Sequence, residues 1–219
     1  MDPTKDDCLS RNLAVTKEIF GEDIEIYAVG FSMGSNLLMR YMGSPSKCEE
    51  KRSVKAIVSV SGAFDMAATV AQVSKPAFGL LDFYVLRKLK SDVSNHVFSN
   101  GFVEGAHKAT SVYEYESMTR ARELGVSSAA KLLRRFSCNA FVANIETPLL
   151  VVTAKDDLVT KYEFVPVEDL QRCPKALTAV YDKGGHCDFF FEKVSRKTGK
   201  TYHKEFMAGP TFTFFEQVD

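Results

Sequence analysis

Three residue types that together perform nucleophilic acyl transfer follow one another in this 219-residue chain: a serine, a carboxylate and a histidine. The serine is Ser32, in the pentapeptide Gly-Phe-Ser-Met-Gly at residues 30–34. The apolar run 24–29 before it is typical of a buried strand, and residues 33–42 after it have helical spacing. A serine at such a corner is held clear of the sheet at a helix N-terminus, where free N–H groups stabilise a developing negative charge.

The residues beside Ser32 have expected roles of their own. Gly30 and Gly34 should let neighbouring backbone pass closely. The backbone N–H of Met33 should be one donor of an oxyanion hole. The alternative is an ordinary strand-to-helix turn, because short Gly and Ser patterns also arise by chance. The predicted strand before the motif and the predicted helix after it favour the catalytic interpretation.

A serine hydroxyl needs a general base, and the base needs an orienting carboxylate. When the serine lies at a strand-to-helix corner, the acid and then the histidine follow it along the chain. Of the four histidines, His186 is favoured because it lies in a glycine loop shortly after a predicted strand at 177–181. His96 and His107 fall in a long helical segment and His203 near the C-terminal helix, so we interpret these three as surface or packing residues.

The acid is expected after the predicted strand 149–153, which Pro148 opens. The chain offers Asp156 and Asp157 there. In the common pattern after such a strand, a small residue is followed three positions later by the acid. With Ala154 as the small residue, this pattern favours Asp157, and Asp156 becomes a loop-stabilising neighbour that stays the alternative acid. A solvated turn is the remaining interpretation of both.

These side chains need a scaffold of buried strands that alternate with helices. The predicted strands cover residues 24–29, 54–60, 149–153 and 177–181. The predicted helices of the same scaffold cover residues 11–20, 33–42 and part of 200–217, with an interruption near Gly209-Pro210. Strands that lack polar alternation are typical of a parallel sheet covered on both faces. The fold class is therefore α/β, with about four mainly parallel strands and flanking helices.

Residues 66–146 separate the second and third predicted strands and are predicted mostly helical. They are too many for a crossover, so we predict a helical cap inserted into a single domain of residues 1–219, with a core at 1–65 and 147–219. The cap segment 76–90 is strongly apolar with basic residues at its end. We interpret it as a helix packed on the core with a solvated basic end. The alternative is a lid that receives an acyl chain and meets a phosphate or a membrane surface.

The composition excludes several classes of protein. Lys+Arg and Asp+Glu are 28 each and no long basic run occurs, so nucleic acid is not expected as a partner. No apolar run approaches the ~18 residues that span a bilayer, and the N-terminus resembles neither a signal nor a transit peptide. The five scattered cysteines form no Cys-x-x-Cys pair, which predicts reduced thiols, no zinc site and a cytoplasmic location.

Four stretches together resemble the YheT-like branch of the α/β-hydrolase superfamily, which includes eukaryotic abhydrolase-domain lipases and esterases. They are YAVGFSMGSNLLMRYMG, VKAIVSVSGAFDM, TPLLVVTAKDDLVT and GGH, and the similarity extends from about residue 6 to about residue 215. The resemblance implies hydrolysis of carboxylic esters, including lipid or phospholipid acyl esters, without a cofactor or metal. It implies Ser32 as nucleophile, Asp157 as orienting acid and His186 as general base. It also implies that Asn36 caps a helix.

The resemblance is incomplete at the N-terminal side. The family's sheet has eight strands, and this sequence supplies the last four. The missing region normally carries the loop with the second oxyanion N–H, and losing one donor costs on the order of 10²–10³ in rate. We therefore expect an N-terminally truncated chain with an open edge on strand 24–29. A catalytically impaired or non-catalytic protein, a thioesterase or acyltransferase, and a membrane anchor ahead of residue 1 stay open as alternatives, as does the oligomeric state.

Overall fold

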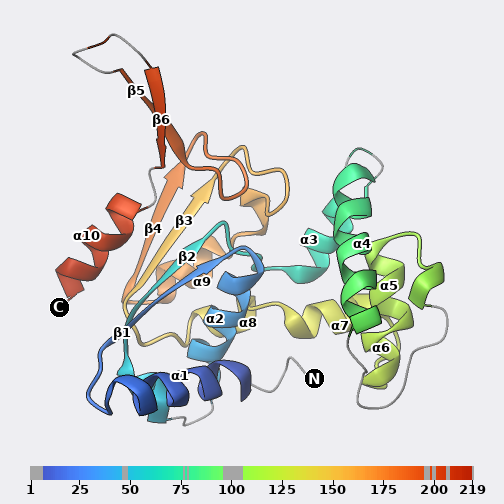
Figure 1. Ribbon diagram of the computed structural model, residues 1–219, viewed down its shortest axis with the longest axis horizontal. Helices are drawn as coiled ribbons and strands as arrows, with labels where there is room; N and C mark the ends of the chain where they lie inside the picture. The colour runs from blue at the N-terminus through green and yellow to red at the C-terminus, as the bar shows by residue number, and fades with distance from the viewer. Residues whose placement is uncertain are drawn as a thin grey trace. The chain divides into compact units, whose positions relative to one another are not determined.

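The structure is a computed structural model that describes residues 7–45, 49–75, 77, 79–95, 106–194, 198, 201–205 and 208–218 (Figure 1). The chain forms two compact units. The helical unit contains the described residues from Asp65 to Ser137. The sheet unit contains those from Asp6 to Phe64 and from Cys138 to Asp219.

The sheet unit is built on four parallel strands in the order β1-β2-β3-β4 (Figure 1). Their bounds are Ile26–Phe31, Val54–Val60, Leu149–Ala154 and Ala176–Tyr181. All four predicted strands are confirmed, with β1 ending two residues later than expected. The α/β class is therefore confirmed as well. Among the described strands β1 lies at one edge, where Val29 and Phe31 are exposed, as the sequence led us to expect.

Helices cover both faces of this sheet. The sheet unit contains α1 (Asp7–Phe20), α2 (Met33–Gly43), η1 (Glu49–Ser53), α8 (Asn139–Val142), η4 (Tyr162–Phe164), α9 (Val167–Arg172) and α10 (Ala208–Val218). Successive residues of a strand point to opposite faces. Val151 accordingly joins a core with Met39 of α2, whereas Val152 joins a second core with Phe214 of α10. Burial on both faces explains why these strands lack polar alternation.

The C-terminal region differs from the prediction. An antiparallel pair that the sequence did not predict is formed by β5 (Phe190–Val194) and β6 (Thr201–Glu205), and β6 lies at the start of the segment 200–217. The helix α10 begins at Ala208 and runs through Gly209 and Pro210 without interruption. The expected break is wrong because Pro210 lies in the first turn, where the N–H that proline lacks has no intrahelical acceptor.

The helical unit contains α3 (Met66–Val73), α4 (Gly79–Asn95), η3 (Ala106–Lys108), α5 (Val112–Met118), α6 (Arg120–Glu123) and α7 (Ala129–Phe136). Short polar side chains begin several of these helices, as when Asp65 Oδ1 accepts from Ala68 N at 2.9 Å. Residues 138–146, which the sequence assigns to the end of the cap, belong to the sheet unit. There Cys138 N donates to Phe64 O at 3.0 Å and Ile145 lies in the core.

The helix α4 differs from its expected packing. Leu86 is buried, but three large apolar side chains of α4 are at least 61% exposed: Leu80, Phe83 and Tyr84. The expected solvated basic end is also wrong for Lys90, whose Nζ donates to the carbonyls of His107 at 2.8 Å and Ala109 at 2.6 Å. Helical spacing indicates which residues share a face but not which face is buried. No helix in the described ranges is long and apolar enough to cross a bilayer.

Candidate active site

Ser32 lies at the corner between β1 and α2 with φ 49° and ψ −114°, a conformation that non-glycine residues rarely adopt. Its backbone is held by three hydrogen bonds: Ser32 N donates to Val60 O at 2.9 Å, and Ser32 O accepts from Ala63 N at 3.2 Å and from Asn36 N at 3.3 Å. Ser32 occupies the N-cap position of α2, yet its hydroxyl makes no capping bond. Ser32 Oγ instead lies 2.9 Å from His186 Nε2.

Gly30 and Gly34, the two glycines of the pentapeptide, differ in how closely other atoms approach them. A Cβ on Gly30 would lie 2.6 Å from Ser35 Cα in the first turn of α2, so the predicted close approach holds there. A Cβ on Gly34 would meet no described atom within 4 Å, so the same prediction is wrong for Gly34. The role expected of Asn36 is also wrong, because Asn36 lies inside α2 and its Nδ2 donates to Ala63 O at 2.7 Å. It ties α2 to the loop after β2.

The imidazole of His186 joins the other two predicted residues. His186 Nδ1 lies 3.0 Å from Asp157 Oδ2, and His186 Nε2 faces the Ser32 hydroxyl. With the proton on Nδ1 donated to the carboxylate, Nε2 is the acceptor that can take the serine proton. The Asp157 side chain is fully buried and that of His186 is 27% exposed. The structure therefore brings Ser32, His186 and Asp157 together, with the serine end of the line reachable from solvent.

A tight turn surrounds the carboxylate of Asp157. Val159 N and Thr160 N donate to Oδ1 at 2.8 and 2.9 Å, and Thr160 Oγ1 donates to Oδ2 at 2.7 Å. Burial by itself would raise the pKa of Asp157, but the hydrogen bonds from His186 and Thr160 together hold that pKa below its ordinary value. Asp157 is therefore ionised at neutral pH and accepts a hydrogen bond from His186 Nδ1–H.

The chain matches the protein family described as alpha/beta hydrolase fold over residues 23–193. It belongs to the alpha/beta hydrolase fold family. Among solved structures, acetyl xylan esterase 1 from Thermoanaerobacterium sp. superposes on this alpha/beta hydrolase with a TM-score of 0.51 and 13% identity. That match covers 95% of this chain and 50% of the esterase. At this identity the likeness concerns the fold alone.

Three curated proteins illustrate how the chain relates to longer hydrolases. The monoacylglycerol lipase of Saccharomyces cerevisiae is 21% identical, over 79% of this chain and 40% of its own length. The phospholipase ABHD3 of Bos taurus is 26% identical, over 74% of this chain and 40% of its own. YheT of Escherichia coli is 25% identical, over 74% of this chain and 48% of its own. The chain thus covers less than half the length of each of these relatives.

Asp156 and Gly185 shape the loop that carries His186. Asp156 Oδ1 accepts from Gly184 N at 2.9 Å and Gly185 N at 2.8 Å, which is a loop-stabilising contact. Gly185 has φ +53°, a left-handed conformation that glycine adopts without strain. Thr160 is not among the residues predicted from the sequence. A signal existed, because an aspartate followed three residues later by threonine is a common turn in which the carboxylate accepts local N–H groups.

The remaining sequence candidates lie elsewhere or are not described. Met33 is the first residue of α2, and the N–H groups of the first turn of a helix have no intrahelical acceptor. The Met33 N–H could therefore point at a bound oxyanion. Its oxyanion role stays a prediction. His107 is an exposed residue of η3 in the helical unit. His96 lies outside the described residues, and His203 is described only as part of the backbone of β6.

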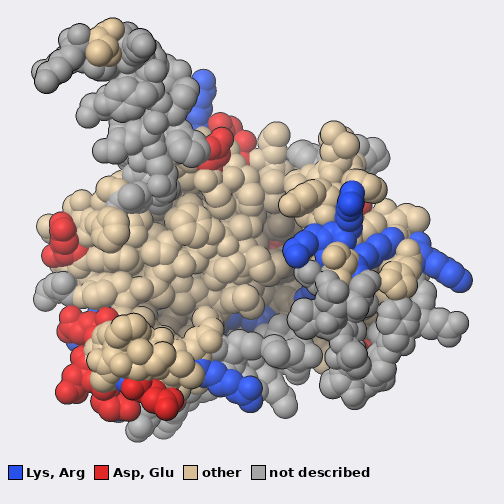
Figure 2. All heavy atoms as spheres, viewed as in Figure 1, with Lys and Arg blue, Asp and Glu red and all other residues tan. Residues whose placement is uncertain are grey.

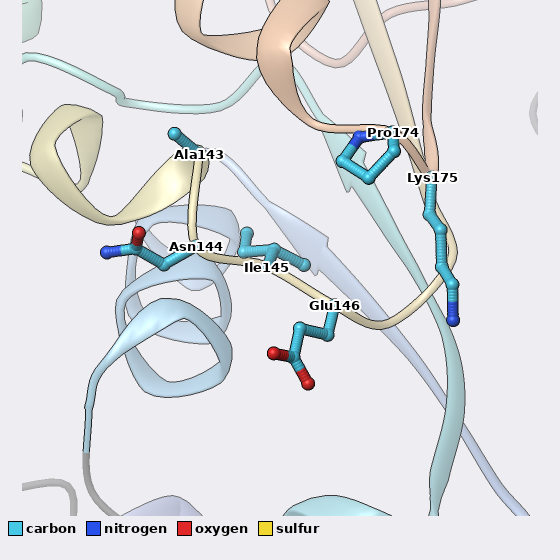
Figure 3. Close-up of a pocket in the computed structure, with 6 residues that line it drawn as sticks. All are labelled: Ala143, Asn144, Ile145, Glu146, Pro174 and Lys175. Carbon is cyan, nitrogen blue, oxygen red and sulfur yellow. The ribbon is translucent and has the colours of Figure 1, made fainter.

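A cavity of about 500 Å³ lies at the other end of the strands (Figure 3). Its lining residues all precede β3 or β4: Ala143, Asn144, Ile145, Glu146, Pro174 and Lys175. In parallel α/β sheets, ligands bind outside the carboxyl ends of the strands. Ser32, Asp157 and His186 all follow strand ends, so the carboxyl edge and not this cavity is the candidate site.

Proposed function

We propose that this alpha/beta hydrolase cleaves carboxylic esters through Ser32, His186 and Asp157. The observation that carries the proposal is the continuous line of contacts from Asp157 Oδ2 through the imidazole to Ser32 Oγ, with steps of 3.0 and 2.9 Å. The lowered pKa of Asp157 supports it, because an ionised acid keeps His186 in the tautomer that can act as a base. The names of the lipase and phospholipase relatives agree with this chemistry.

The proposed reaction proceeds through an acyl-enzyme. His186 Nε2 takes the proton of Ser32 as Oγ bonds to the acyl carbon, and the Met33 N–H stabilises the oxyanion. The bond from the acyl carbon to the alcohol oxygen then breaks, and His186 returns the proton to the departing alcohol. A water molecule then gives a proton to His186 and attacks the acyl carbon. The bond from that carbon to Ser32 Oγ breaks, and His186 returns the proton to Oγ as the acid leaves. Asp157 orients the imidazole throughout.

A fluorophosphonate probe tests this function directly, because it reacts with an activated serine. The full-length protein should be labelled at Ser32, and Ser32→Ala should abolish both labelling and turnover of a short p-nitrophenyl ester. A folded wild-type protein that is neither labelled nor active would overturn the proposal and favour a non-catalytic role. Parallel assays with thioesters and with acyl acceptors other than water separate esterase from thioesterase or acyltransferase activity.

We further propose lipid acyl esters as the substrate class and the YheT-like branch as the closer family. The 25% identity with YheT and the names of the lipase and phospholipase relatives support this. Helix α4 supports it independently. Its exposed side chains Leu80, Phe83 and Tyr84 share one helical face, and the exposed Arg87 follows one turn later on that face. Figure 2 shows Lys and Arg gathered over the helical unit on the face in view.

An apolar face followed by a cation suits the boundary of an anionic lipid surface. Wild-type protein should sediment with vesicles that contain phosphatidylserine more strongly than with pure phosphatidylcholine vesicles. Phe83→Glu should weaken that binding about tenfold, because it places a charge among the apolar contacts. Phe20→Glu is the matched control, since Phe20 is 70% exposed at the end of α1. Equal binding of both variants would remove the membrane surface from the proposal and leave ester hydrolysis intact.

A further inference from the structure

Three non-glycine residues in the described ranges have positive φ: Ser32 (49°), Ser61 (46°) and Cys187 (63°). Such conformations are unfavourable for residues with a Cβ and persist only where the surroundings impose them. Ser32 carries the proposed nucleophile. The other two have no part in the proposed reaction, yet they are hydrogen-bonded to each other beside it. Strain concentrated at one place points to a function for Ser61 and Cys187 as well.

Ser61 is the first residue after β2 and is completely buried. Ser61 N donates to Val152 O in β3 at 2.9 Å, so the middle of the sheet fixes its backbone. Its hydroxyl accepts from Cys187 N at 3.1 Å. Cys187 directly follows His186, so a rigid point of the sheet holds the backbone next to the proposed base.

The loop that carries His186 is thus fastened on both sides. Before the histidine, Asp156 Oδ1 holds the N–H groups of Gly184 and Gly185. After it, the Ser61 hydroxyl holds that of Cys187. Asp156 is exposed, where water can replace the contact, whereas Ser61 is buried, so its hydroxyl is harder to replace.

Ser61 also lies against the turn of the proposed acid. Thr160 Oγ1, which is 2.7 Å from Asp157 Oδ2, is 3.2 Å from the Ser61 carbonyl. Thr160 Oγ1 has one proton, which it donates to the charged carboxylate of Asp157 in preference to the neutral carbonyl of Ser61. The Ser61 carbonyl is nevertheless in contact with the threonine and limits its movement. One residue therefore contacts both loops that must meet Ser32. Burial raises the pKa of the Cys187 thiol, so Cys187 adds no thiolate beside the histidine.

We propose that Ser61 is a positioning residue whose hydroxyl, through the backbone of Cys187, sets the distance between the His186 imidazole and Ser32. The inference rests on the proposed function. Without the hydroxyl, Cys187 N–H loses its acceptor and the loop shifts to find another. A displacement of about 1 Å can cost on the order of 10²-fold in rate. Ser61 touches no reacting atom, so its loss should lower kcat and leave KM nearly unchanged.

The test compares Ser61→Ala, Ser61→Gly and Ser59→Ala in the full-length protein. Ser61→Ala removes the hydroxyl and keeps the Cβ at positive φ, whereas Ser61→Gly removes the hydroxyl and relieves the strain. Ser59→Ala is the matched control, because Ser59 is a buried serine of β2, two residues before Ser61, and its hydroxyl bonds to Ser35 Oγ at 2.5 Å. For each variant, kcat, KM, the rate of fluorophosphonate labelling and the melting temperature are measured.

Both Ser61 variants should lose about 10- to 100-fold in kcat and in labelling rate, with KM within about twofold. The melting temperature of Ser61→Gly should be no lower than that of Ser61→Ala. A loss of kcat in Ser61→Gly therefore reports on positioning and not on folding, and it can be measured even if Ser61→Ala unfolds. Ser59→Ala should keep kcat within about threefold. Ser61→Gly with wild-type kcat would overturn the inference. An unlabelled, inactive wild-type protein would instead overturn the proposed function.

Discussion

Two of the buried carboxylates in the described part of the chain, one in each unit, have pKa values shifted in opposite directions. Asp157 of the sheet unit is held in its ionised form, with a lowered pKa. Glu116 of the helical unit is about as inaccessible, with a side chain 7% exposed, but burial raises its pKa and the nearby Arg120 only partly offsets that. The depth of burial therefore does not decide the direction in which the pKa of a carboxylate is shifted.

The difference lies in the donors that each carboxylate meets. Asp157 accepts from two backbone N–H groups, the Thr160 hydroxyl and the His186 ring. Glu116 Oε1 lies 3.1 Å from Arg120 Nη2, while its Oε2 is buried with no hydrogen-bond partner in the described part of the chain. Asp157 begins a turn whose N–H groups point back at it, whereas Glu116 lies within α5, where the helix uses those groups. Local backbone geometry therefore stabilises the charge of Asp157 and leaves the charge of Glu116 poorly stabilised.

The largest expected effect follows from replacing the charged carboxylate of Asp157 with a neutral amide. Asp157→Asn should lower kcat on the order of 10³- to 10⁴-fold, because an amide no longer holds the histidine in the tautomer that accepts the serine proton. The measurement is steady-state kinetics, with circular dichroism to verify folding. Asp156→Asn is the matched control, since its amide oxygen can still accept from the two glycine N–H groups. A loss in Asp156→Asn together with near wild-type kcat in Asp157→Asn would assign the orienting role to Asp156, the alternative that the sequence left open.

Removing one donor from Asp157 should have an intermediate effect. Thr160→Val keeps the shape and the backbone N–H but removes the hydroxyl 2.7 Å from Oδ2. Hydrogen bonds to charged groups contribute about 1.5–3 kcal/mol, so the stability of the sheet unit should fall by that amount in chemical denaturation. We also expect kcat to fall about tenfold as the carboxylate gains freedom.

A second buried threonine provides the comparison for that variant. Thr119 Oγ1 donates to the uncharged Tyr115 O at 2.6 Å in the helical unit. Thr119→Val should cost only about 0.5–1.5 kcal/mol. If Thr119→Val lowered the stability more than Thr160→Val, the charge of Asp157 would not explain the strength of its hydrogen bond to Thr160.

The contrast also shows what the sequence could supply. The strands were predictable because their apolar runs are continuous, and β2 matches its predicted range of 54–60. Ser32, Asp157 and His186 were predictable because their order and their places after strands are local features. Ser61 was not predictable, because its contact with Cys187 joins residues 126 positions apart and leaves no pattern in either segment. The burial of Glu116 was hidden for a similar reason, since helical spacing does not reveal which face of a helix is covered.

Acid should affect the two units in opposite directions. Glu116 has a raised pKa when folded, so the helical unit should gain stability as the pH falls through that pKa, with the full gain below the ordinary value of 4.5. Asp157 has a lowered pKa when folded, so its contribution is complete above the ordinary value of 3.8 and is lost as the pH falls further through the folded pKa. Hydrogen exchange of peptides from each unit, measured from pH 7 to pH 3, should show slower exchange in the helical unit first. Parallel loss of protection in both units across this range would contradict the contrast.

The smallest expected effect concerns Glu116, the carboxylate with few hydrogen-bond donors. Glu116→Gln removes the buried charge while keeping the shape, and the freed Arg120 is 32% exposed and can be hydrated. We expect the helical unit to become about 1 kcal/mol more stable at pH 7 and to lose its gain on acidification. Arg120→Gln should have the opposite sign, because it leaves the Glu116 charge buried without its cation. Destabilisation by Glu116→Gln would mean that the carboxylate is supported by more than Arg120, and the number of donors would then no longer explain why Asp157 and Glu116 differ.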